Sequence, residues 1–184
     1  SANAAEIAAW QKKVPEAKEP GKATKAPGKA DEEEKPKIVG AKTKVALVLS
    51  SVQARQGDIV NAGIHFIIPP KWHIFWKNPG DFGEAPKIQW RLPKGVSAGD
   101  VQWPKHELYE KGGYRQNVYH DELMLIVPLT LSSDLQTGEL QLGAKVAWQE
   151  CEVACVQGKA DISASLLVGV ENKPSAAAPQ IKEW

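Results

Sequence analysis

The feature that most constrains the fold is an alternation of apolar and polar residues that recurs from Val45 onward. In the run ELQLGAKVAW the residues that share one face are Leu140, Leu142, Ala144, Val146 and Trp148. The runs KADISASLLV and LMLIVPLTL alternate in the same way. A period of two is typical of a strand with one buried face and does not fit the period of a helix. The body of the chain is therefore predicted to consist of β-strands.

Further candidate strands precede these runs, and turn-forming residues separate them. The earlier candidates are Val45–Ala54, Ile59–Ile68, Trp72–Lys77, Lys87–Leu92 and Asp100–Trp103. Segments rich in Gly and Pro, such as KNPGDFGEAP and LPKGVSAGD, mark the turns between them. About seven or eight short strands with no convincing helix predict an all-β fold, an antiparallel β-sandwich of about 130 residues. A closed barrel is the alternative.

Composition divides the chain into three parts. Residues 1–42 are rich in Lys, Glu, Ala and Pro and hold few large apolar side chains, which predicts a polar, low-complexity linker or extension. The sandwich is expected over residues 43–172, and residues 173–184 form a C-terminal tail. The net charge of +1, with basic residues interleaved among acidic ones, argues against a nucleic-acid binder. No segment approaches the roughly 20 apolar residues of a membrane span, so no direct membrane insertion is expected.

The two cysteines of the chain, Cys151 and Cys155, flank the tip of a predicted hairpin. A bond between residues so close in sequence stabilises the fold by only about 2 kcal/mol on the loop-closure model. This placement favours a disulfide that is broken and remade. Two free buried cysteines, an inert hairpin disulfide and a Cu(I) site remain as alternatives, whereas zinc would need further ligands. A thioredoxin-like fold is excluded, because the spacing is not C-x-x-C and no helices alternate with the strands.

Several neighbouring residues bear on this pair. Glu150 and Glu152 place carboxylates beside the thiols, which disfavours the thiolate and would leave the pair slow without a partner. Trp76 alternates with Trp72 and is expected to pack in the core or to line the cysteine site. His73 falls on the opposite face of the same strand and is expected to be exposed to solvent.

Three segments in order carry a resemblance to a known family. They are PPKWHIFWKNPGDFGEAPKIQWRLPKGV, VQWPKHELYEKGGYRQNVYHDELMLIVPL and KVAWQECEVACVQGKADIS. Together they resemble the N-terminal periplasmic domain of DsbD-type thiol:disulfide interchange proteins, over about residues 43 to 170. The first and third segments are most similar to the variants linked to suppression of copper sensitivity.

The resemblance implies an immunoglobulin-like sandwich in which Cys151 and Cys155 form the redox-active centre. Cys155 matches the cysteine that exchanges with partners, and Cys151 matches the one that closes or resolves the disulfide. The cap loop of the family matches KHELYEKGG, in which Glu107 and Tyr109 fit the pattern and Leu108 replaces an aromatic residue. The cysteines here are closer together than in the best-known members, which implies a tighter active loop.

The implied function is electron transfer by thiol-disulfide exchange in the periplasm of a bacterium, as a protein-disulfide reductase relay domain without a cofactor. The implied partners are a membrane electron donor and thioredoxin-like proteins, such as a disulfide isomerase and a thioredoxin of cytochrome c biogenesis. The alternative is a non-catalytic β-sandwich module that binds copper or docks another protein.

Overall fold

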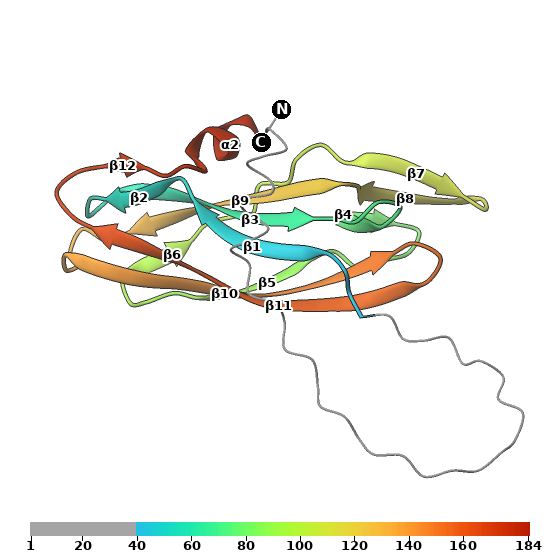
Figure 1. Ribbon diagram of the computed structural model, residues 1–184, viewed down its shortest axis with the longest axis horizontal. Coiled ribbons are helices and arrows are strands. Elements are labelled where there is room, and N and C mark those ends of the chain that lie inside the picture. The colour runs from blue at the N-terminus through green and yellow to red at the C-terminus, as the bar shows by residue number, and fades with distance from the viewer. Residues whose placement is uncertain (1–39) are drawn as a thin grey trace, which may run out of the picture. The chain divides into compact units, whose positions relative to one another are not determined.

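Two β-sheets packed face to face form the fold of the computed structural model, which describes residues 40–184 (Figure 1). The predicted linker over residues 1–42 lies almost entirely outside the described residues. The four-stranded sheet runs β1 (Lys44–Leu49), β3 (Ile59–Ile67), β9 (Glu122–Leu131) and β6 (Val96–Ala98). The second sheet runs β12 (Lys173–Pro174), β2 (Ser51–Ala54), β11 (Cys155–Val168), β10 (Gly138–Cys151), β4 (His73–Gly80), β8 (Tyr114–Tyr119) and β7 (Glu107–Lys111). β5 (Lys87–Arg91) also pairs with β10, beside β4. The predicted antiparallel sandwich is confirmed, and two distinct sheets replace the alternative of a closed barrel.

The core lies between the sheets, as the period of two requires. Leu142, Ala144, Val146 and Trp148 of β10 are all buried, and Trp148 packs edge-on against Phe66 of the facing sheet with 6.0 Å between ring centroids. The longest hairpin of the described chain joins β10 and β11 in register over their whole length. This pairing carries the two cysteines to the end of the ribbon, at the right in Figure 1.

Three segments differ from the predicted strands. The predicted strand Val45–Ala54 is divided at Ser50, so that β1 pairs with β3 while β2 pairs in parallel with β11 of the other sheet. Asp100–Trp103 makes only an isolated bridge through Gln102, and the short strand β6 forms earlier, within the expected turn. The expected cap loop is a β-hairpin instead, because Gly112 and Gly113 take positive φ angles of 60° and 83° and allow β7 to turn directly into β8.

The residues set apart as a C-terminal tail pack on the sandwich. They contain β12 and a short helix, α2 (Ala178–Glu183), which begins with a proline in its first turn. Ile181 is buried against Val48, Met124 and Ile126, on the side of the four-stranded sheet that faces away from the core. Within residues 40–184 no helix is long and apolar enough to cross a membrane.

Candidate thiol-disulfide site

The β10–β11 hairpin brings the two cysteines together. Cys151 ends β10, Cys155 begins β11, and the two residues are direct cross-strand partners. Their Cα atoms are 4.1 Å apart and a disulfide joins them. The connecting loop is closed by a hydrogen bond of 3.3 Å from the Glu152 amide to the Ala154 carbonyl. The cysteines are therefore bonded, and the alternative of two free buried thiols does not hold in this structure.

The two halves of the disulfide differ in their access to solvent. Cys151 is buried, with 5% of its surface exposed, and packs with Phe75 and Val118. Cys155 is exposed. Val153, at the tip of the loop between them, has 95% of its surface exposed. An approaching thiol therefore reaches the Cys155 side of the bond more readily than the Cys151 side.

The cap hairpin β7–β8 packs on the disulfide cluster through Val118 of β8 and Tyr109 of β7. Tyr109 packs on the cluster of Phe75, Val118 and Cys151. Leu108 points away and is 63% exposed, as the alternation of a strand requires. The Glu107 carboxylate is exposed and lies 3.2 Å from Nδ1 of His120. Of the three cap residues predicted from the sequence, Tyr109 alone joins the buried cluster around the disulfide.

A histidine that the sequence analysis expected in solvent lies beneath this cap. His73 is the cross-strand partner of Cys151, and the expectation of an exposed side chain is wrong, since only 4% of its surface is exposed. The prediction that it faces away from the inter-sheet core holds, but Tyr109 and His120 cover that face, with ring centroids 5.2 Å and 5.7 Å from the imidazole. Burial lowers the pKa of His73 to about 4, and the charges of His120 and Lys111 lower it as well.

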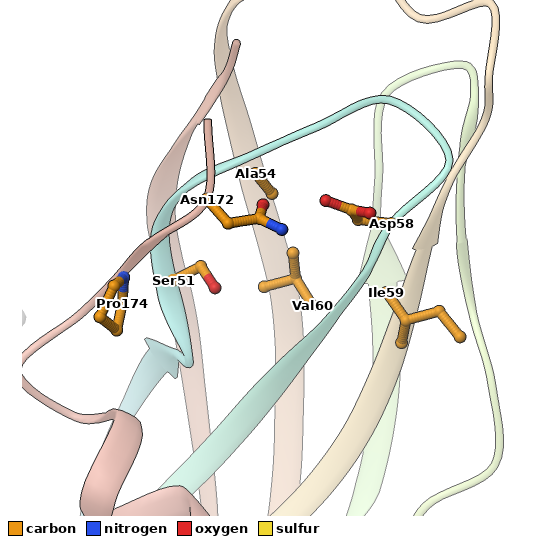
Figure 2. A pocket seen from close by; sticks show the side chains of 7 residues that line it. All are labelled: Ser51, Ala54, Asp58, Ile59, Val60, Asn172 and Pro174. Atoms are coloured by element: carbon orange, nitrogen blue, oxygen red, sulfur yellow. The ribbon is translucent and has the colours of Figure 1, made fainter. Parts of the chain in front are cut away.

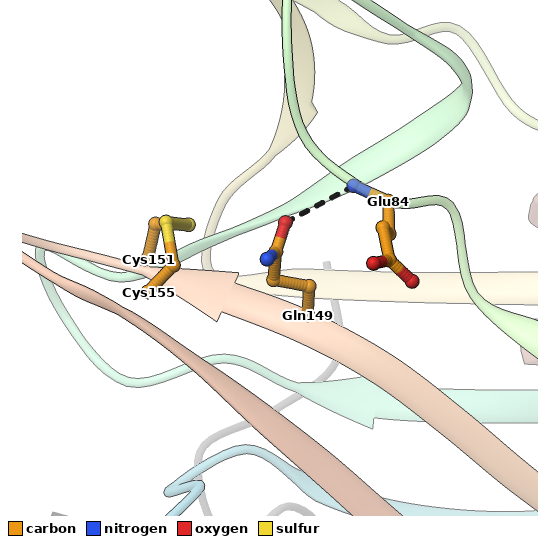
Figure 3. The surroundings of a disulfide bond; sticks show 4 residues. All are labelled: Glu84, Gln149, Cys151 and Cys155. Atoms are coloured by element: carbon orange, nitrogen blue, oxygen red, sulfur yellow. Dashed lines mark hydrogen bonds between the residues drawn. A yellow bond between two sulfur atoms is a disulfide. The ribbon is translucent and has the colours of Figure 1, made fainter. Parts of the chain in front are cut away.

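The loop between β4 and β5 forms a second wall of the site. Gly83 lies so close to the Phe75 ring that a Cβ atom there would come within 2.4 Å of it. The Glu84 amide donates a hydrogen bond of 3.1 Å to the side chain of Gln149, two residues before Cys151 (Figure 3). The segment KNPGDFGEAP, expected as a turn, begins with the last four residues of β4, and its remaining residues, 81–86, form a loop that covers the outer side of this sheet next to the disulfide.

The remaining predicted residues have other surroundings. Glu150 is fully buried on the inner face, where its carboxylate accepts hydrogen bonds from the Thr43 amide at 3.0 Å and from Nε1 of Trp148 at 2.8 Å. Its role in this structure is to fasten the start of β1 to the end of β10. Glu152 is half-buried in the hairpin loop. Trp76 packs against the main core and stacks on His106, with 4.0 Å between ring centroids, and is not part of the cluster around Cys151.

One surface hollow lies away from the disulfide. It has a volume of about 300 Å³ and is lined by Ser51, Ala54, Asp58, Ile59, Val60, Asn172 and Pro174 (Figure 2). Because Ala54 pairs with Val168, this hollow lies at the far end of β11 from Cys155. Among residues 40–184, no group of three or more His, Cys, Asp or Glu side chains is arranged to hold a metal ion. Cys155 thus lies at the surface at the opposite end of β11 from this hollow.

Comparison of the sequence with models of known protein families identifies the family of this chain. Residues 44–166 match the family described as thiol:disulfide interchange protein DsbD, N-terminal. The chain belongs to this family. The DsbD N-terminal family is a periplasmic family of thiol-disulfide exchange domains, and the resemblance found in the sequence is confirmed. Comparison with curated protein sequences gave no match.

Two solved structures illustrate the similarity. The N-terminal periplasmic domain of ScsB from Proteus mirabilis is 20% identical, with a TM-score of 0.53 over 77% of this chain and 52% of that one. The chain thus spans about half the length of that relative. The DsbD N-terminal domain of Neisseria meningitidis, in its reduced form, is 18% identical with a TM-score of 0.39, over 70% of this chain and 89% of that one. Family membership and the two packed sheets confirm the predicted immunoglobulin-like sandwich.

The site residues that the sequence analysis did not identify lie on the face of the larger sheet that points away from the core. His73, Phe75 and Val118 alternate with core residues, and the period of two by itself assigns such positions to solvent. The available signal was that two of them, Phe75 and Val118, are apolar at positions where a polar residue would be expected. Apolar residues on both faces of a strand indicate that something covers each face.

Proposed function

We propose that this protein relays electrons by thiol-disulfide exchange through the Cys151–Cys155 disulfide. The observation that carries the proposal is the asymmetry of the bond, in which Cys155 is exposed at the end of the ribbon while Cys151 is buried beneath Tyr109. A bond with one accessible sulfur has a defined point of attack.

The exchange proceeds in two steps. The thiolate of a reduced partner attacks Sγ of Cys155, a mixed disulfide forms between the partner and Cys155, and the bonding electron pair of the old disulfide leaves on Sγ of Cys151. A second thiolate of the partner then attacks its own sulfur in the mixed disulfide and releases Cys155 as a thiolate. The partner has been oxidised to a disulfide, the pair has gained two electrons, and the two thiolates take protons from water.

The reduced pair passes its electrons on by the reverse chemistry. Cys155 is the nucleophile toward the disulfide of a second protein, and Cys151 resolves the mixed disulfide. Family membership supports thioredoxin-like proteins as partners. We further propose a membrane protein as the distal donor and a disulfide isomerase or a cytochrome c maturation thioredoxin as acceptors. On this proposal the protein is a thiol:disulfide oxidoreductase domain of the periplasm.

The test is a comparison of two single-cysteine variants. Cys151→Ala keeps the exposed Cys155, and Cys155→Ala keeps the buried Cys151 as its matched control. Each is mixed with a thioredoxin-like protein whose single cysteine carries a thionitrobenzoate group, and the released thionitrobenzoate is followed by its colour. We expect Cys151→Ala to form the mixed disulfide at least about tenfold faster, because thiol exchange requires access to the attacking sulfur. Equal rates for the two variants, or no adduct with either, would overturn the proposal.

A further inference from the structure

A buried imidazole belongs to the residue directly opposite Cys151, whose sulfur must leave during exchange. His73 and Cys151 are directly opposite each other on β4 and β10, so their side chains project from the same face of the sheet. Directly opposed side chains in antiparallel strands have Cβ atoms about 5 Å apart. Phe75, two residues further along β4, packs on Cys151 and lies edge-on to the His73 ring at 5.4 Å between centroids, which places all three in one cluster.

The His73 imidazole has a buried nitrogen atom, Nε2, without a hydrogen-bond partner within the described structure. A buried polar group without a partner costs roughly 1–3 kcal/mol, so its persistence calls for an explanation. The surrounding side chains do not supply a partner, because Phe75 and Tyr109 present their rings to it and His120 is engaged with Glu107.

The exchange reaction would create a hydrogen-bond acceptor for this nitrogen. When Sγ of Cys155 is attacked, the electron pair leaves on Sγ of Cys151, which creates a negative charge in a buried, largely apolar pocket. Such a charge is strongly unfavourable unless a hydrogen-bond donor faces it. Two side chains on this face of the sheet have a buried nitrogen without a hydrogen-bond partner in the described structure, Nε2 of His73 and Nε2 of Gln116. Gln116 is the cross-strand partner of Tyr109, whereas His73 is directly opposite Cys151.

We propose that His73 is a further catalytic residue, which donates a ring N–H to the Cys151 thiolate as the disulfide opens and thereby stabilises the leaving group. The inference rests on the proposed exchange at Cys155. The S–S bond between Cys151 and Cys155 breaks, the new bond forms between the partner sulfur and Cys155, and the electron pair stays on Sγ of Cys151. The proton of the His73 N–H group remains on the ring throughout, and the thiolate later takes its proton from water. No oxidant or reductant beyond the partner thiol is required.

The charge state of the imidazole agrees with this role. The depressed pKa of His73, about 4, keeps the ring neutral near pH 7, because burial and the positive charges of His120 and Lys111 oppose protonation. A neutral ring in a closed pocket does not disturb the oxidised state. It still carries one N–H group that becomes useful only when charge develops on Cys151.

The test uses a small dithiol, so that partner docking does not enter. Oxidised wild-type protein, His73→Phe and His73→Gln are reduced with dithiothreitol near pH 7, and the thiols released are counted over time. We expect His73→Phe, which keeps an aromatic ring without a donor, to react about tenfold more slowly, since a hydrogen bond to a charged group contributes roughly that much or more. His73→Gln restores an N–H group and should recover part of the rate. His106→Phe is the matched control and should stay within about twofold, because His106 stacks on Trp76, which is not part of the cluster around Cys151.

A second readout separates this role from a structural one. In the background Cys155→Ser the ultraviolet absorbance of the Cys151 thiolate is titrated with and without His73→Phe. We expect the midpoint to move upward by about 1 pH unit, equivalent to a tenfold loss of thiolate stabilisation. Unchanged reduction rates and an unchanged midpoint in a folded His73→Phe protein would overturn the inference while leaving the relay intact. Failure of the wild type to exchange with any thioredoxin-like protein would overturn the relay, whatever His73 does toward dithiothreitol.

Discussion

Acidification should destabilise this protein through one buried histidine. The pKa of His73 is lowered to about 4 in the folded protein, with burial as the largest cause, against 6.5 for an unperturbed histidine. The unfolded chain therefore binds more protons than the folded one between these values. Stability contributed by the neutral ring is fully present above about pH 6.5 and is lost as the pH falls toward 4.

The size of the effect follows from the two pKa values. At pH 5 the unfolded state gains about 2 kcal/mol from protonation of this one residue, and below pH 4 the gain approaches about 3 kcal/mol. These amounts are a large fraction of the 5–15 kcal/mol that typically stabilises a small domain. Other groups titrate in the same range, so the informative quantity is the difference between the wild type and a variant without the imidazole.

The assay is urea unfolding of the oxidised protein at a series of pH values, followed by tryptophan fluorescence. His73→Phe keeps a ring in the pocket, and its free energy of unfolding should fall by about 2 kcal/mol less than that of the wild type between pH 8 and pH 5. The control His106→Phe should fall in parallel with the wild type. Tyr109→Ala, which uncovers the ring, should lose most of the His73 effect. Parallel curves for the wild type and His73→Phe would refute the reasoning, because they would mean that the buried ring titrates normally.

Two further predictions concern the groups that hold the site in place. Glu150→Gln should destabilise the protein by about 1.5–3 kcal/mol in urea unfolding, because a buried carboxylate that accepts several hydrogen bonds is replaced by a group with one acceptor oxygen. Glu152→Gln is the control, and an equal loss of stability there would contradict the role of Glu150 in joining β1 to β10. Gly83→Ala should cost about 1–3 kcal/mol, because its φ of 115° disfavours a side chain and the new Cβ would meet the Phe75 ring. Gly112→Ala, where φ is 60° and no atom lies within 4 Å of a Cβ, should cost less, and the reverse order would show that the loop is not packed as described.

The sandwich could be predicted from the sequence because burial on one face imposes a period of two. Leu142, Val146 and Trp148 of β10 show this pattern and are buried in the core. The division of Val45–Ala54 between the sheets was missed, although the alternation changes phase at Ser50 and Ser51, from Val45, Leu47 and Leu49 to Val52 and Ala54. The sheet that each half joins depends on its pairing with β3 or β11, which lie far away in the sequence.

The part of the site that depends on local sequence could be predicted, and the part that depends on distant segments could not. The spacing of Cys151 and Cys155 around a hairpin tip depends only on local sequence, and the disulfide follows from the register of two adjacent strands. His73 comes from a strand about 80 residues earlier, and its burial depends on Tyr109 folding over the sheet. A single-strand pattern contains no information on what covers the outer face.

The most direct test of the central claim is the equilibrium between this disulfide and a dithiol protein. Oxidised protein is mixed with a reduced thioredoxin-like protein, the mixture is quenched with acid, and the free thiols of each chain are counted by alkylation and mass spectrometry. We expect two thiols to appear on Cys151 and Cys155 for each disulfide formed in the partner, with a mixed disulfide through Cys155 at early times. A Cys151–Cys155 bond that stays closed while the partner remains reduced would contradict the account.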